Sequence, residues 1–142
     1  YLNTALIYYD QEKLLLSVKN LSRLMLQNDF TSIGKSFQLK IHIAELIVRY
    51  DLKQINIIIT KIKYIKKLFK DLIKDANFKR DKQLIEIINL LTYCNNISAD
   101  KKLLKKITLL SKSIDDEAAN DLDIINYNIW LNNLILNKND FI

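Results

Sequence analysis

Glycine and proline are nearly absent from this chain of 142 residues, which has a single glycine, Gly34, and no proline. These two residues build most tight turns in sheets and in irregular folds. Without them, few positions remain at which a β-hairpin turn with positive φ could form at low energetic cost. The sequence therefore favours a fold made of helices.

Cysteine and long apolar runs are also scarce. Cys94 is the only cysteine, which excludes an intrachain disulfide and a cysteine-based metal site. This favours a reducing compartment, and we expect a cytoplasmic protein. No run of about 18 uncharged apolar residues occurs, so we expect no membrane span. The chain begins with Tyr1 and has no signal-peptide pattern, and we expect it to be a piece of a longer protein.

Apolar residues recur every three or four positions along most of the chain, which is the period of an amphipathic helix. Hydrophobic residues make up 49% of the sequence and charged residues 27%, a balance typical of one globular domain, here residues 1–142. Short breaks between the periodic segments indicate antiparallel neighbours. The pattern predicts seven helices, at about 2–9, 11–27, 32–50, 53–74, 79–95, 99–112 and 114–136. Gly34 is expected in the first turns of the third helix.

The most regular of these segments is 52–74, and we expect the rest of the chain to be organised around it. Asp51 is predicted to cap its first turn, with Gln54 reaching back as in a capping box. Lysines recur on a second side of the helix. The predicted buried stripe consists of Leu52, Ile55, Ile58, Ile62, Ile65, Leu68 and Leu72.

The sequence also contains an internal repeat. Tyr9-Asp10 recurs as Tyr50-Asp51, 41 residues later, and each pair stands between a helix that ends in Tyr and a longer helix. A looser third copy is predicted around Tyr93. With the same offset, three positions of the first longer helix, Ser17, Leu21 and Leu24, fall on Ile58, Ile62 and Ile65.

In this register the chain resembles the tetratricopeptide (TPR) repeat. Tyr8 stands at that family's aromatic position near the end of its first helix, and Asp29 stands at its closing proline. Ser17, Leu21 and Leu24 stand at the small, aromatic and small positions of its second helix. The family's turn glycine is absent, and its repeat is about 34 residues long. The run ELIVRYDL at 45–52, the basic helix after it and Trp130-Leu131 also resemble uncharacterised helical-repeat proteins of Bacteroidetes, a bacterial group.

The resemblance implies an all-α fold in which antiparallel helical hairpins stack as a right-handed TPR-like α-solenoid. It also implies a non-catalytic scaffold without a cofactor, which holds a peptide or a helix of a partner protein in a concave groove. The last helix is expected to cap the array, with Trp130 against the third pair. The end helices could stack on a second copy, which would give a homodimer.

Few residues suggest catalysis. His42 and Glu45 can meet on one helix turn as an acid–base pair, but no nucleophile or second metal ligand accompanies them, and a structural or surface histidine is favoured. For Cys94 we expect packing at a helix end. The acids at 115–117 suit the first turn of the last helix on dipole grounds alone. We therefore expect no catalytic or metal site and no enzyme activity.

Charge is distributed unevenly along the chain. Residues 53–112 carry 15 basic and five acidic side chains, a net of +10, whereas the net charge is +1 over 1–52 and −5 over 113–142. One interpretation is a solvated face in a lysine-rich proteome; another is nucleic-acid binding by the 53–112 segment, which the presence of only three arginines disfavours. The residues predicted to bind a partner protein are Lys63, Tyr64, Lys66, Lys67, Lys70 and Lys74.

Overall fold

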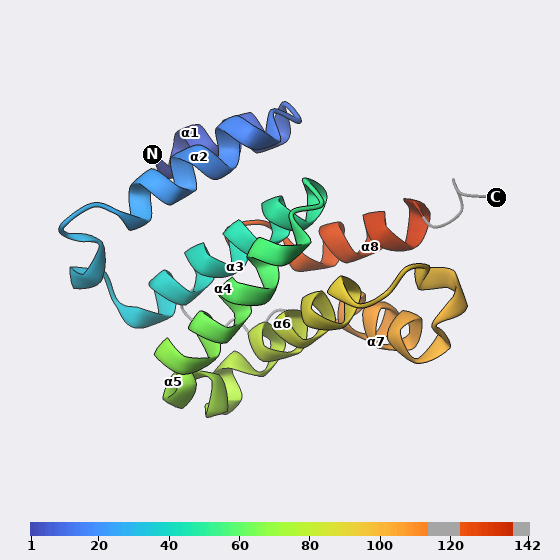
Figure 1. Ribbon diagram of the computed structural model, residues 1–142. Helices are drawn as coiled ribbons and strands as arrows, with labels where there is room; N and C mark the ends of the chain where they lie inside the picture. Colours follow the sequence, from blue (N-terminus) through green and yellow to red (C-terminus); the bar gives the residue numbers. More distant parts are fainter. Residues whose placement is uncertain (114–122, 138–142) are drawn as a thin grey trace.

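A computed structural model describes residues 1–113 and 123–137 of the chain. In these ranges the structure is built of helices and connecting turns and contains no strand, which confirms the predicted all-α class (Figure 1). Its eight α-helices are α1 (Leu2–Asp10), α2 (Leu14–Met25), α3 (Lys35–Asp51), α4 (Ile55–Leu68), α5 (Lys70–Lys74), α6 (Lys79–Thr92), α7 (Lys101–Ser111) and α8 (Tyr127–Asn137). Single turns of 3-10 helix lie at Phe30–Ser32, Ala76–Phe78 and Ile97–Ala99. No helix in the described ranges combines the length and apolarity that a membrane span requires.

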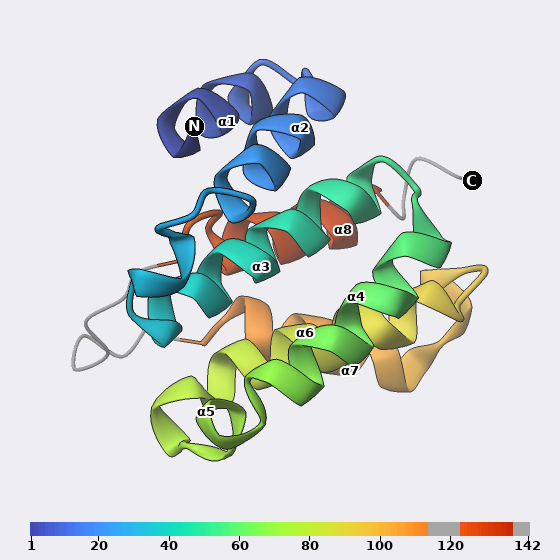
Figure 2. The ribbon, with the colours of Figure 1, turned by 60° about the vertical axis from the view of Figure 1, so that its left-hand side comes forward.

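The centre of the molecule is α3, and the prediction that segment 52–74 has this place is wrong. Every residue from Gln38 to Val48 is buried. α3 packs against α2, α4 and α6, and α8 lies alongside it (Figures 1 and 2). A helix buried on all sides has no clear polar face, whereas α4 shows a clean amphipathic pattern because only one of its faces is covered.

The first two hairpins share one turn, which confirms the 41-residue repeat. α1 ends at Asp10, and α3 ends 41 residues later at Asp51. Likewise, α2 begins at Leu14, and α4 begins 41 residues later at Ile55. Glu12 and Lys53 occupy the same place in the two turns, with φ of 60° and 62°. The N–H of Glu12 donates to the Tyr9 carbonyl at 3.0 Å, and that of Lys53 donates to the Tyr50 carbonyl at 2.9 Å.

The equivalent positions of α2 and α4 are also buried, except Leu24, which is half-buried. Ser17 and Leu21 are each 1% exposed, and Ile58, Ile62 and Ile65 are at most 2% exposed. The Ser17 hydroxyl donates to the carbonyl of Ala5 at 2.8 Å, which fixes α2 on α1. The third pair, α6 and α7, differs because a longer connection with its own 3-10 turn joins the two helices, and Tyr93 in it is 68% exposed.

The predicted long helix 53–74 is interrupted at Phe69, whose φ and ψ of −108° and 26° separate α4 from α5. Phe69 is 1% exposed and Leu68 is 39% exposed, so Phe69 takes the buried position that was predicted for Leu68. Leu72, the predicted end of the stripe, is half-buried against the core. Asp51 is the last residue of α3 and does not cap α4. Gln54 stands at the cap position, but its side-chain oxygen accepts a hydrogen bond from Arg49.

Three further helix starts differ from the prediction. Gly34 is the N-cap of α3 and so lies outside the helix. Asp100, not Ser98, caps α7 by accepting a hydrogen bond from the N–H of Leu103 at 3.0 Å. The predicted start of the last helix at 114 lies outside the described residues, while residues 123–126 are not helical and α8 begins at Tyr127.

The last helix contacts the second helix pair as well as the third. α8 packs on α7, but its indole at Trp130 stands edge-to-face on the Tyr50 ring of α3 with centroids 5.7 Å apart. Trp130 Nε1 also donates to the carboxylate of Asp51 at 3.0 Å. α8 thus lies on the third pair, and Trp130 in addition contacts the second pair, which was not predicted.

Candidate functional site

The six residues predicted to bind a partner are all exposed on α4 and α5. Tyr64 keeps 53% of its surface accessible. α4 contains no acidic residue, so nothing within this helix offsets its lysines. The structure therefore places the predicted residues on a positively charged surface, but it divides them between two sides of α4.

One side of this surface is hollowed into a pocket, which we call the basic pocket. It has a volume of about 240 Å³ and lies between the α4–α5 corner and α6. The lysines that line it come from α4, α5 and α6, and Glu86 is the only acid among the lining residues. The pocket is lined by Lys66, Lys70, Ile73, Lys74, Lys82, Ile85 and Glu86.

The break at Phe69 creates this pocket. The buried Phe69 ring ends α4, and the short helix α5 then brings Lys70 and Lys74 over α6. Asp75 accepts a hydrogen bond from the N–H of Asn77 at 2.9 Å and so starts the 3-10 turn that leads into α6. Three of the six predicted residues, Lys66, Lys70 and Lys74, are brought together here with Lys82, while Lys63, Tyr64 and Lys67 lie outside the pocket.

The chemistry of the basic pocket suits an anion that also carries an apolar group. Its lysine and glutamate side chains give a net charge of +3. Lysine ammonium groups attract carboxylates and phosphates, while their methylene stems remain apolar. Ile73 and Ile85 add an apolar floor. Ile85 is only 1% exposed, so the accessible apolar surface comes from the half-buried Ile73 and the lysine stems. A purely hydrophilic anion would leave this surface in contact with water, and a purely apolar ligand would gain nothing from the lysines.

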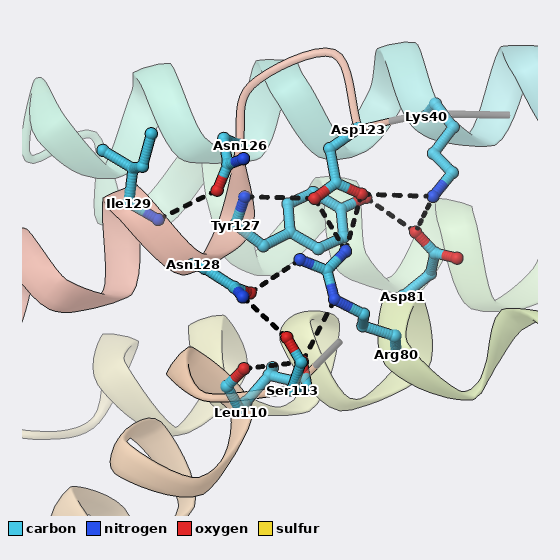
Figure 3. Close-up of polar contacts among 10 residues, drawn as sticks. All are labelled: Lys40, Arg80, Asp81, Leu110, Ser113, Asp123, Asn126, Tyr127, Asn128 and Ile129. Carbon is cyan, nitrogen blue, oxygen red and sulfur yellow. Dashed lines mark hydrogen bonds and ion pairs between the residues drawn. The ribbon is translucent and has the colours of Figure 1, made fainter. Parts of the chain in front are cut away.

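Two of the three arginines are engaged inside the protein and do not belong to the charged surface. Arg49 donates to Glu45 at 3.0 Å and to Gln54 at 2.7 Å. Arg80 forms an ion pair with Asp123 in which its Nη1 donates to both carboxylate oxygens, at 2.7 and 2.6 Å (Figure 3). Arg80 lies in the basic 53–112 segment, but this ion pair turns its charge inward, so it does not contribute to the positively charged surface.

Arg80 belongs to a buried network that the sequence interpretation missed. Lys40 Nζ lies 2.7 Å from Asp81 and 3.4 Å from Asp123, and the Tyr127 hydroxyl donates to Asp81 at 2.7 Å (Figure 3). Burial and the nearby Asp81 carboxylate raise the pKa of Tyr127 well above its usual value. The two cations and two carboxylates balance in charge, and each has partners, so the network serves to hold α3, α6 and α8 together.

One signal for this network was present in the sequence. Asp81 is in helical phase with the buried residues Leu84, Ile88 and Leu91, where an apolar side chain would be expected. A charged residue in such a phase indicates a buried partner of opposite charge. Lys40 gave no comparable signal because α3 is buried on all sides.

His42 lies in an aromatic enclosure on the other side of α4. Its ring centroid is 6.1, 5.7 and 5.5 Å from those of Phe30, Tyr64 and Phe69, respectively. It is 5% exposed, and its Nδ1 is buried without a hydrogen-bond partner among the described residues. Burial lowers the pKa of this imidazole, against the opposing effect of the nearby Glu45 charge.

Glu45, the predicted acid–base partner of His42, is engaged elsewhere. Its carboxylate is fully buried, accepts the Arg49 hydrogen bond and forms an ion pair with Lys61 at 3.2 Å. Neither His42 nor Glu45 lines the basic pocket. The arrangement is that of a packed histidine beside a neutralised carboxylate, as expected for a structural role.

The other chemical candidates form no further site among the residues that the structure describes. Cys94 is half-buried and packs against the core. Within 1–113 and 123–137, no three histidine, cysteine or acidic side chains form a group that could hold a metal ion. The acids at 115–117 lie outside the described residues.

Comparison with known proteins gives no relative. No family model matches the sequence, and no curated protein or solved structure is significantly similar to it. The function must therefore be inferred from the site itself.

Proposed function

We propose that this protein is a non-catalytic interaction module whose basic pocket binds an acidic peptide segment of a partner protein. The observation that supports this is the grouping of four lysines around the apolar floor of Ile73 and Ile85. A peptide that carries carboxylates beside one apolar side chain would satisfy both parts of the pocket. The proposal includes a TPR-like array, with α1–α2 and α3–α4 as repeats, for which the shared turn is the support.

A peptide fits the pocket better than a nucleic acid does. Nucleic-acid phosphates are hydrophilic and would leave the isoleucine floor uncovered. Arginine is the preferred residue for two-pronged phosphate and base recognition, yet Arg49 and Arg80 are engaged in internal ion pairs. Nucleic-acid binding by the basic 53–112 segment is the outcome that the following experiment would reveal instead.

The test compares three labelled probes by fluorescence anisotropy across a salt series. The first is an acidic peptide with a central Leu-Phe pair, the second is the same peptide with Ser-Ser in the centre, and the third is a set of single- and double-stranded oligonucleotides. We expect the Leu-Phe peptide to bind about tenfold more tightly than the Ser-Ser peptide, which corresponds to about 1.4 kcal/mol. Oligonucleotides that bind more tightly than both peptides, with a steep salt dependence, would contradict the proposal.

A matched pair of variants locates the binding. Lys70→Glu with Lys74→Glu removes two lysines from the pocket, and Lys101→Glu with Lys105→Glu makes the same charge change on exposed residues of α7. We expect the first variant to lose binding of the Leu-Phe peptide and the second to retain most of it. Equal losses would mean that net charge, and not the pocket, governs binding.

A further inference from the structure

A second surface of α4, separate from the basic pocket, is apolar. Ile57, Tyr64 and Leu68 are 41%, 53% and 39% exposed. Their spacing of seven and four residues places them along one side of the helix, over a length of about 16 Å at 1.5 Å per residue. Lys66 points away from this side and lines the pocket against α6. We call the three residues the apolar stripe.

One lysine lies within this stripe, and its charge is neutralised. Lys61 falls between Ile57 and Tyr64 on the same side of the helix, and it forms the ion pair with the buried Glu45 at 3.2 Å. Its side chain is 32% exposed. The methylene stem of Lys61 therefore extends the apolar surface, while its ammonium group is held inward by Glu45.

The tyrosine of the stripe is packed against a buried ring. The Tyr64 ring stands 5.7 Å from the His42 ring, which is in turn packed between Phe30 and Phe69. An exposed aromatic side chain that is held by its neighbours loses little conformational entropy when a ligand covers it. This is the property of an anchor residue in a binding surface.

The charge beside the stripe indicates the partner. Lys63 and Lys67 are exposed on the adjacent solvent face of α4. The helix has no acidic residue of its own. Lys63 and Lys67 would therefore attract a ligand that carries carboxylates along one edge. To cover the stripe, the ligand would also need an apolar face of about three helical turns.

We propose that the apolar stripe docks an amphipathic helix of the partner protein, with acidic residues along the edge that meets Lys63 and Lys67. This deepens the proposed function and rests on it, because the helix would form a second contact with α4, on a different side from the acidic segment in the basic pocket. Helix-in-groove recognition uses anchors at i, i+3 or i+4 and i+7, and the stripe offers the complementary spacing.

The experiment uses two designed acidic peptides of identical composition and the full chain labelled with ¹⁵N. In one peptide, leucines at i, i+4, i+7 and i+11 form one helical face; in the other, the same leucines are scrambled around the helix. We expect at least tenfold tighter binding of the first peptide, with amide shifts centred on Ile57, Tyr64 and Leu68. Equal affinities, or shifts confined to the pocket, would overturn this inference and leave the proposed function standing.

Substitutions separate the two sites. Ile57→Ser with Leu68→Ser should weaken the first peptide at least tenfold, whereas Leu109→Ser, at a 63% exposed leucine on α7, should leave its affinity unchanged. The thermal midpoint of each variant shows whether it is folded. Failure of both designed peptides and of the Leu-Phe peptide to bind would remove the proposed function together with this inference.

Discussion

The Tyr9 hydroxyl donates a hydrogen bond of 3.1 Å to the carboxylate of Asp51, which joins the end of α1 to the end of α3. Trp130 of α8 donates to the other oxygen of the same carboxylate at 3.0 Å. Burial raises the pKa of Asp51, although both hydrogen bonds act against this shift. The equivalent residue of the first repeat, Asp10, is exposed, so the same position in the two turns has two different roles.

Replacement of Tyr9 by Phe should reduce the free energy of unfolding by about 1–2 kcal/mol, because it removes a partly buried hydrogen bond to a charged acceptor. Urea denaturation would measure the loss. Tyr8→Phe is the matched control, since the Tyr8 hydroxyl has no hydrogen-bond partner among the described residues, and its effect should stay below about 0.5 kcal/mol. Equal losses in the two variants would show that the bond to Asp51 does not contribute.

Removal of Lys40 should be much more costly. Lys40→Met keeps the length of the side chain but leaves the buried Asp81 and Asp123 without one of their cations, and we expect a loss of about 3 kcal/mol or more. Lys63→Met is the control, because Lys63 is exposed on α4. It should change the free energy of unfolding by less than about 0.5 kcal/mol. A Lys40→Met protein as stable as the parent would mean that the network is dispensable for folding.

Stability should fall on acidification because of His42. Its pKa in the folded state is lower than the ordinary value of 6.5, so below pH 6.5 the unfolded chain takes up a proton that the folded protein resists. The free energy of unfolding should therefore decrease as pH falls from 6.5, by at most about 1.4 kcal/mol per pH unit, until the folded-state pKa is reached.

His42→Gln isolates this contribution from that of the other titrating groups. Chemical denaturation of both proteins between pH 7.5 and 5 should show that the free energy of unfolding falls more steeply with decreasing pH in the parent. Above about pH 7 the two slopes should be equal. Parallel curves over the whole range would indicate that His42 titrates normally in the folded protein.

The end of α4 offers a comparison of two neighbouring residues. Phe69→Ala should reduce the free energy of unfolding by about 3–5 kcal/mol, because it leaves a cavity at a side chain that is 1% exposed. Leu68→Ala, at 39% exposure, should lower it by less than about 1 kcal/mol. Thermal or urea denaturation would measure both, and the reverse order would support the uninterrupted helix that the sequence predicted.

The correct predictions rest on local sequence patterns, whereas the errors concern features that are decided by tertiary packing. The repeat of Tyr9-Asp10 at Tyr50-Asp51 predicted a shared turn because the same backbone hydrogen bonds recur over a few residues. The break at Phe69 could not be predicted, since Leu68 and Phe69 are both apolar and only tertiary contacts decide which one faces inward. The central position of α3 was missed because single-face periodicity finds helices at the surface.

Part of the lining of the basic pocket was predicted from the sequence, but its geometry was not. Lysine spacing placed Lys66, Lys70 and Lys74 on one basic segment, but Lys82 joins them only because α6 folds back against the α4–α5 corner. The apolar stripe was largely missed, because Ile57 and Leu68 looked like further apolar residues of a helix whose partners were unknown. Of the three stripe residues, only Tyr64 was among those predicted to bind a partner.

The all-round burial of α3 has a consequence for partial unfolding. α4 and α6 each pack on this helix, so neither can detach without exposing part of it to water. The α1–α2 hairpin differs, because its main contact with the rest of the molecule is the single interface between α2 and α3. Amide protons of α1 and α2 should therefore exchange with solvent through a local opening of low free energy. Amide protons of α3 should exchange only when the whole domain unfolds, which requires a higher free energy.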